Sequence, residues 1–329
     1  MSAKNRNFIL VTGGAGFIGS HLIDRLLENG KNILCLDNLN DFYNPKIKKL
    51  NQKKHFEYDN FVFVKGDIRD RETVEKLFNN FNISTVIHLA AMAGVRPSLE
   101  NPSLYTDVNI IGTQVLLETM RNKEVGKFIF ASSSSIYGNS KHTPFTEDAA
   151  VDWQISPYGA TKKMGEILCY PYHHLYGISI VGLRFFTVYG PRQRPEMAIH
   201  KFIRKMFRGE ELPFYGDGNT ARDYTYIDDI INGILKSLII ENDYEIFNLG
   251  NSEPIKLKEL VSILENTSGL EARLLKQDLP PGDVFQTYAD ISRAKKRLDY
   301  EPGIHFEAGI GLFMEWYKSM YENHRKLYA

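Results

Sequence analysis

A tyrosine and a lysine four residues apart, Tyr158 and Lys162, are the pair of side chains in this sequence best suited to proton transfer. At the start of a helix, this spacing places both side chains on one face, within reach of a shared ligand. A tyrosine has a reference pKa of about 10, which is too high for a base at neutral pH, but a nearby ammonium group favours the phenolate. The pair could therefore remove a proton from a substrate hydroxyl.

Four consecutive serines, 132–135, precede this pair. We expect them at the carboxyl end of a central strand, which is where ligands bind to open parallel sheets. A run of serines alone is typical of a polar turn. Its place ahead of Tyr158 predicts instead that a serine hydroxyl shares the substrate oxygen with the tyrosine.

A glycine-rich loop near the N-terminus, Thr12–Gly19, follows a short apolar run and opens a helical pattern, which is the context of a dinucleotide-binding loop. Gly13 permits a tight turn, Gly16 lets the backbone approach a pyrophosphate, and Gly19 allows close packing of helix and strand. Asp37 ends the next predicted strand. Its carboxylate can accept hydrogen bonds from the adenosine ribose and would repel a 2′-phosphate, so we expect NAD rather than NADP.

Short β-branched runs alternate with amphipathic stretches of helical length in the first half of the chain, which predicts βαβ units and a doubly wound parallel sheet of the Rossmann type. The expected strands are Phe8–Thr12, Ile33–Asp37, Phe61–Lys65, Thr85–Ala90, Lys127–Ser132 and Ile178–Phe185. The expected helices are Ile18–Asn29, Arg71–Asn80, Leu104–Asn122 and Tyr158–Tyr176.

The second half has a different texture, because proline and glycine interrupt shorter elements, as at Gly190-Pro191 and Pro280-Pro281-Gly282. We predict an NAD-binding Rossmann domain over residues 1–186 with the catalytic Ser, Tyr and Lys. Residues 187–329 would mainly form a smaller α/β substrate lobe, with some elements interleaved. The ligand cleft is expected between the two lobes.

Composition narrows the class of partner. Forty basic residues balance forty acidic ones among 329, so overall charge indicates neither nucleic acid nor an anionic membrane as partner. Cys35 and Cys169 show neither a disulfide framework nor metal-ligand spacing, so we expect a reducing, cytoplasmic location and no metal. No segment approaches the roughly 18 apolar residues of a membrane span, and no membrane association is expected.

The glycine loop, the serine segment and the Tyr-x-x-x-Lys pair occur in the order found in the extended short-chain dehydrogenase/reductase family, which this sequence resembles over nearly its whole length. Further segments look like the sugar-nucleotide members of that family: His88–Ala91, Asp107–Thr113, Leu183–Gly190 and Arg222–Tyr224. The resemblance implies NAD as cofactor and a UDP-sugar as substrate. It also implies a homodimer, which the Leu104–Asn122 and Tyr158–Tyr176 helices could form, although their apolar faces could equally belong to the core.

The same resemblance assigns roles to individual residues. Ser133, Tyr158 and Lys162 would be catalytic, and the positive nicotinamide ring would help to favour the phenolate. The implied cofactor-binding residues are Gly13, Gly16, Phe17, Ile18, Gly19, Asp37, Asn38, Asp67, Ile68, Leu89, Ala90, Ala91 and Asn109, with Tyr158 and Lys162. The implied substrate-binding residues are Ser134, Ser135, Phe186, Thr187, Arg192, Arg194, Arg222 and Asp283, of which Arg222 and Asp283 would hold UDP.

One branch is more similar than the others, because Asp37–Pro45 and Ala93–Pro102 look like UDP-glucuronate 4-epimerases. The UDP-glucose epimerases carry Asn where this chain has Thr187. The 4,6-dehydratases and UDP-glucuronate decarboxylases carry acids near the strand end where this chain has Ser134 and Ser135. The expected reaction is inversion at C4 of UDP-glucuronate through a transient 4-keto sugar, with Ser135 and Thr187 on the carboxylate.

Three alternatives remain open from the sequence. A UDP-glucuronate decarboxylase or a UDP-glucose 4-epimerase would use the same fold, and the product would distinguish them. A non-catalytic NAD-sensing protein would need the glycine loop, but it would have no use for Tyr158 and Lys162 together.

Overall fold

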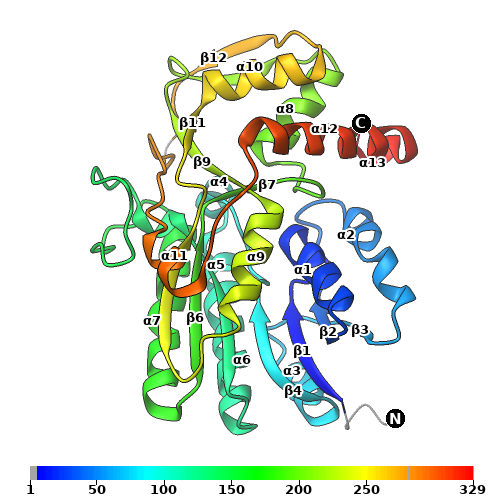
Figure 1. Cartoon of the computed structure of the whole chain (residues 1–329), viewed down its shortest axis with the longest axis vertical. Helices are drawn as coiled ribbons and strands as arrows, with labels where there is room; N and C mark the ends of the chain where they lie inside the picture. The colour runs from blue at the N-terminus through cyan, green and yellow to red at the C-terminus, as the bar shows by residue number, and fades with distance from the viewer. Residues whose placement is uncertain (1–5, 281, 329) are drawn as a thin grey trace.

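A seven-stranded parallel sheet forms the centre of the computed structural model, which describes residues 6–280 and 282–328 (Figure 1). The strand order is β10-β6-β5-β4-β1-β2-β3. The strands are β1 (Asn7–Thr12), β2 (Asn32–Asp37), β3 (Phe61–Lys65), β4 (Asn82–His88), β5 (Lys127–Ser133), β6 (Ser179–Phe185) and β10 (Tyr244–Leu249). The order reverses between β1 and β4, where doubly wound sheets bind their ligands. The predicted Rossmann-type fold class is thus confirmed.

Helices bury both faces of this sheet, which explains why its strands are almost continuously apolar. Val11 and Ile33 belong to one core cluster, with α1 (Phe17–Glu28) and α9 (Ile227–Ser237). Leu10 and Leu34, their neighbours along the strands, belong to the opposite cluster. The helices that cover that second face are α3 (Arg71–Asn80), α6 (Gly112–Asn122) and α7 (Pro157–Tyr176).

A smaller lobe lies beyond the carboxyl ends of the main strands, at the top of Figure 1. Two small sheets, β11-β9-β7 and β12-β8, belong to it. Its elements are β7 (Thr187–Tyr189), α8 (Ala198–Phe207), β8 (Leu212–Tyr215), β9 (Ala221–Tyr226), β11 (Pro254–Lys256), α10 (Leu257–Ser268), β12 (Leu274–Gln277) and α12 (Phe306–Asn323). Because β10 joins the main sheet, the two halves interleave along the chain, and the boundary at residues 186–187 stays a prediction.

Short elements complete the chain. They are α2 (Pro45–Asn51), η2 (Lys53–Glu57), α4 (Val95–Glu100), α5 (Pro102–Thr106), η3 (Asp107–Ile111), η4 (Ser134–Tyr137), α11 (Ser292–Leu298) and α13 (Arg325–Tyr328). Pro281, part of the proline-rich segment noted in the sequence, lies outside the described residues. Among the helices of residues 6–280 and 282–328, none is both long and apolar enough to cross a membrane.

The helix predicted over Leu104–Asn122 is interrupted. A π-helical turn, η3, separates α5 from α6 and turns Asn109 inward. The Asn109 amide donates to the Met92 carbonyl and to Thr161 Oγ1, at 3.0 Å each, and its Oδ1 accepts from the Met92 N–H at 2.8 Å. Such π-turns are frequent at functional sites, and this one ties α7 to the chain segment that follows β4.

Candidate active site

One large cleft, with a cavity volume of about 600 Å³, gathers residues from the carboxyl edge of the main sheet and from the smaller lobe. Most of the residues predicted from the sequence line it. They are Gly13, Gly16, Phe17, Ile18, Gly19, Asp37, Asn38, Asp67, Ile68, Leu89, Ala90, Ala91, Ser133, Ser134, Ser135, Tyr158, Lys162, Phe186, Thr187, Arg194, Arg222 and Asp283. Asn109 and Arg192 are not among the lining residues.

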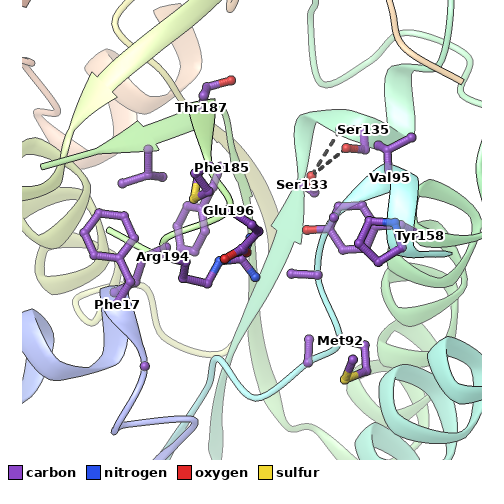
Figure 2. A pocket seen from close by; sticks show the side chains of 18 of the residues that line it. Phe17, Met92, Val95, Ser133, Ser135, Tyr158, Phe185, Thr187, Arg194 and Glu196 are labelled. Carbon is purple, nitrogen blue, oxygen red and sulfur yellow. Dashed lines mark hydrogen bonds and ion pairs between the residues drawn. The ribbon is translucent and has the colours of Figure 1, made fainter. Parts of the chain in front are cut away.

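Tyr158 owes its place to the start of α7. Ser156 caps this helix, with its hydroxyl accepting from the Gly159 N–H at 3.1 Å, and Pro157 occupies the first helical position. A Cβ atom at Gly159 would lie 2.6 Å from the Ser135 carbonyl oxygen, so only glycine allows the helix to approach the serine segment this closely. The first turn of α7 therefore places Tyr158 beside Ser133 and Ser135 (Figure 2).

The serine segment turns sharply where β5 ends. Ser133 Oγ accepts from the Ser135 N–H at 3.1 Å and lies 3.2 Å from Ser135 Oγ. Ser133 also pairs in register with Phe185 of the neighbouring strand β6. Ser135 and Thr187, each two residues further along, therefore both reach the cleft from the same edge of the sheet.

The surroundings of Tyr158 act on its pKa in opposite directions. Burial is the largest effect and leaves the pKa of Tyr158 above its usual value, while a hydrogen bond from the Ser133 hydroxyl and the positive charge of Arg194 lower it in part. The N-terminus of α7 also favours a negative charge at this position. The sequence pointed to Lys162 as the group that favours the phenolate, whereas in the structure the groups that lower the pKa of Tyr158 are Ser133 and Arg194.

Lys162 is buried, and its Nζ donates to the Ala131 carbonyl at 2.7 Å. Burial lowers the pKa of this ammonium group to about 8. Its fixed position, one helical turn after Tyr158, leaves it facing the same cleft. Tyr158, Ser133 and Lys162 together make a site for proton exchange with a hydroxyl or carbonyl oxygen.

The glycine loop is packed tightly enough to exclude side chains at two positions. Gly13 has a φ of +71°, and a Cβ atom there would lie 2.7 Å from the Ala90 nitrogen. A Cβ atom at Gly19 would lie 2.3 Å from the Gly13 carbonyl oxygen. Gly16 offers no side chain to cap α1, so the N–H groups of its first turn are presented to the cleft, as pyrophosphate binding requires.

Asp37, the last residue of β2, lines the same part of the cleft as the glycine loop. Its carboxylate accepts from the Ala15 N–H at 3.1 Å and from the Leu39 N–H at 2.8 Å. Burial raises the pKa of Asp37, while these hydrogen bonds and the charge of Lys48 act against the rise. Lys48 also lines the cleft and donates to Asn40 Oδ1 at 2.7 Å. Sequence reasoning missed Lys48, since a lysine in a short basic helix is usually solvated. The residues present therefore fit a dinucleotide.

A cluster of three cationic side chains, Arg96, Lys201 and Arg222, lines another part of the cleft. Arg96 of α4 pairs with Asp283 at 2.7 Å and donates to the Tyr215 hydroxyl at 2.8 Å. Lys201 and Arg222 also line the cleft, and their pKa values are lowered by burial and by the charge of Arg96. From the sequence, Arg96 was noted only as part of the Ala93–Pro102 segment that carries the family resemblance. No motif in the sequence indicates Lys201. Three cations beside one carboxylate suit a diphosphate.

The two arginines after Gly190-Pro191 have different surroundings. Arg194 lines the cleft, with its guanidinium carbon 5.6 Å from the centroid of the Phe42 ring and its Nε 3.1 Å from Glu196 Oε1. Arg192 instead pairs with Asp24 of α1 at 2.7 Å. Of the two candidates for substrate contact, the geometry favours Arg194 (Figure 2).

Over the described ranges 6–280 and 282–328, no three His, Cys, Asp or Glu side chains come together as a metal site would require.

Comparison with known proteins gives a consistent set of relatives. The family model described as GDP-mannose 4,6 dehydratase matches residues 10–312. A UDP-glucuronate 4-epimerase of Thermodesulfobacterium geofontis is 47% identical over 318 residues, which are 96% of this chain and 97% of the relative. The crystal structure of the Bacillus cereus UDP-glucuronic acid 4-epimerase with UDP-glucuronic acid and NAD has a TM-score of 0.91 at 39% identity, covering 95% of this chain and 100% of that one. A UDP-glucose 4-epimerase of Thermotoga maritima with UDP-glucose has a TM-score of 0.88 at 35% identity, covering 95% and 99% of the two chains.

Proposed function

This chain belongs to the GDP-mannose 4,6 dehydratase family of extended short-chain dehydrogenases/reductases, and we propose that within it the protein is a UDP-glucuronate 4-epimerase. It would interconvert UDP-glucuronate and UDP-galacturonate. The observation that supports this most directly is the serine segment: Ser133 lies beside Tyr158, and Ser134 and Ser135 place hydroxyls in the cleft at the positions where the family resemblance implies acids for dehydratases and decarboxylases.

The residues of the cleft divide the reaction between them. Bound NAD would accept the hydride of C4 and later return it, so that the cofactor is regenerated in each turnover. Tyr158 removes the proton of the O4 hydroxyl and gives it back at the end. Ser133 donates a hydrogen bond to the same oxygen. Lys162, one helical turn after Tyr158 on α7, supplies a positive charge to the site. Between the two proton transfers the keto sugar turns about its diphosphate link, which Arg96, Lys201 and Arg222 hold, and exposes its other face.

The substrate carboxylate sets an additional demand on the site. A ketone at C4 is β to the C6 carboxylate, so carbon dioxide is lost when the bond to the carboxylate stands perpendicular to the carbonyl plane. Ser135 and Thr187 reach the cleft from one edge of the sheet and can donate two hydrogen bonds to the carboxylate. Hydrogen bonds to an ionised group are about twice as strong as neutral ones, so this pair can fix the carboxylate without a full counter-charge.

Removing either hydroxyl is expected to loosen the carboxylate. Ser135→Ala and Thr187→Ala should each lower epimerisation of UDP-glucuronate by about tenfold, the equivalent of about 1.4 kcal/mol. UDP-pentose should form in place of part of the product, because the carboxylate can then leave the plane of the ketone. Chromatography with mass spectrometry measures both nucleotide sugars.

Two variants serve as controls for this experiment. Thr187→Ser keeps a hydroxyl and should stay close to the wild type, and Ser140→Ala changes an exposed serine outside the cleft lining. Wild-type rates in both Ser135→Ala and Thr187→Ala, with no added UDP-pentose, would place the carboxylate elsewhere.

The preference for NAD is expected to depend on Asp37. Asp37→Ala should reduce the ratio of NADP to NAD dissociation constants by about tenfold or more, because the carboxylate that repels a 2′-phosphate is gone while Lys48 remains. Titration of the cofactor-stripped protein with both dinucleotides gives this ratio. Asp41→Ala, which removes an exposed carboxylate from the same loop, is the control. Equal affinity of the wild type for both cofactors would refute the role of Asp37.

We also propose that the protein is a cytoplasmic homodimer. Both cysteines are free and buried, which fits a reducing compartment. On α7, Met164, Ile167 and Tyr170 are 47%, 59% and 52% exposed, an apolar face that a second copy of the chain could cover. Light scattering of the purified protein should give twice the mass of one chain, and the mass of a single chain would exclude the dimer.

A further inference from the structure

We propose that Asp24 on α1 is a positioning residue for the reaction: by binding Arg192 it fixes the 190–197 loop, the segment Gly190–Met197 that brings Arg194 into the cleft. The proposal rests on the proposed function for the reaction that Arg194 serves. Arg192 becomes the point at which α1 binds the loop, in place of the substrate contact that the resemblance implied.

Two residues one helical turn apart on α1 bind two consecutive residues of the loop. Asp24 Oδ2 lies 2.7 Å from Arg192 Nη1, and His21 Nε2 lies 2.8 Å from the Pro191 carbonyl oxygen. Positions i and i+3 lie on one face of a helix, so both contacts come from the same side of α1. The loop is therefore bound through both its backbone and a side chain.

The carboxylate of Asp24 is itself held in place. Its second oxygen, Oδ1, lies 2.7 Å from Nε2 of His55, which is fully buried. Burial alone would raise the pKa of Asp24, but the hydrogen bond with His55 and the charge of Arg192 together keep it below its usual value. Asp24 thus stays ionised and oriented toward Arg192.

The backbone of the loop is held in a conformation that side chains disfavour. Arg192 has a φ of +63°, in the left-handed region, which residues other than glycine and asparagine seldom adopt. Such a conformation persists only where the surroundings enforce it. The next residue, Gln193, is also fixed, since its amide donates to the Val188 carbonyl at 3.1 Å and its Oε1 accepts from the His200 N–H at 3.2 Å.

The fixed positions of Pro191, Arg192 and Gln193 determine where the next residue, Arg194, lies. Its guanidinium meets the Phe42 ring and Glu196 inside the cleft, and its charge acts on Tyr158. Helix α1 also begins in the glycine loop. The glycine loop and the 190–197 loop are therefore both attached to the same helix. Asp24 consequently sets the position of Arg194 relative to both the dinucleotide site and Tyr158.

A purely structural role for this ion pair predicts a different result. Asp24 and Arg192 are only 24% and 22% exposed, and Asp24 also pairs with the buried His55, so loss of Asp24 is expected to lower the melting temperature as well. The effect on turnover, measured on folded protein, separates the two roles. Because the effect passes through Arg194, it should disappear when Arg194 is already absent.

The test is a double-mutant cycle on turnover of UDP-glucuronate. Asp24→Ala and Arg192→Gly, the second chosen because glycine tolerates the left-handed backbone, should each lower kcat about tenfold at a temperature where circular dichroism shows each variant to be folded. In an Arg194→Ala background, Asp24→Ala should lower kcat by less than twofold further. Arg25→Ala, at an exposed neighbour on α1, should have wild-type kcat. A full tenfold loss in the Arg194→Ala background would overturn the proposal.

Hydrogen exchange of the 190–197 segment, measured without any sugar nucleotide, separates this proposal from the proposed function. Exchange should be faster in Asp24→Ala than in the wild type, whichever sugar the enzyme converts. Unchanged exchange would overturn the role of Asp24. A wild type that leaves UDP-glucuronate unconverted would contradict the proposed function instead.

Discussion

Replacing Tyr158 by phenylalanine should lower kcat by about 10²- to 10⁴-fold, the usual contribution of a positioned general acid or base. The ring remains, with its edge-to-face contact to Tyr105 at a centroid distance of 6.2 Å, so the shape of the cleft is kept. Only the oxygen that exchanges a proton with O4 is lost. Affinities for NAD and UDP-glucuronate should therefore stay within a few-fold of the wild type.

Product formation gives kcat for this variant, and calorimetric titration gives the two affinities. Tyr321→Phe, in α12 and away from the cleft lining, controls for loss of a tyrosine hydroxyl. Turnover of Tyr158→Phe near the wild-type rate would remove Tyr158 from the mechanism. A large loss of affinity in that variant would assign it to binding instead.

The second large effect is expected at the cofactor loop. In Gly19→Ala, the new Cβ atom would lie 2.3 Å from the Gly13 carbonyl oxygen and 2.7 Å from the Gly14 Cα, so the backbone of the loop must move. Displacing it moves the N–H groups that face the pyrophosphate, and we expect NAD affinity to fall by about 100-fold, or about 2.7 kcal/mol.

The control for this variant is another glycine to alanine change. Gly311 lies in α12, where an added Cβ atom has open space, so Gly311→Ala should bind NAD like the wild type. Titration with NAD measures both proteins, and circular dichroism verifies that each is folded. Wild-type NAD affinity in Gly19→Ala would show that the loop does not hold the cofactor.

Local patterns in the sequence predicted six strands of the main sheet, because strands buried on both faces leave apolar runs such as Phe8–Thr12. The seventh, β10, was not predicted. It lies in the second half of the chain and pairs with β6 across more than 60 residues of sequence, and periodicity does not reveal such a pairing. The π-turn at Asn109 was missed for a related reason, because its contacts to Met92 and Thr161 are tertiary.

Residues within motifs could be placed in the cleft from sequence, but their partners could not. The motifs predicted that Tyr158, the serine segment and the glycine loop would share a site, and all of them line the cleft. Nothing local to Arg96 shows that it meets Asp283, 187 residues further along the chain. The same holds for Arg192, whose local sequence gives no sign of Asp24 on the first helix.

The most direct test of the function is to incubate the purified protein and NAD with UDP-glucuronate and to identify the products by nuclear magnetic resonance. We expect UDP-galacturonate in equilibrium with UDP-glucuronate, with no release of carbon dioxide and no accumulation of reduced cofactor. Formation of UDP-pentose as the main product, or no conversion of UDP-glucuronate, would contradict the assignment.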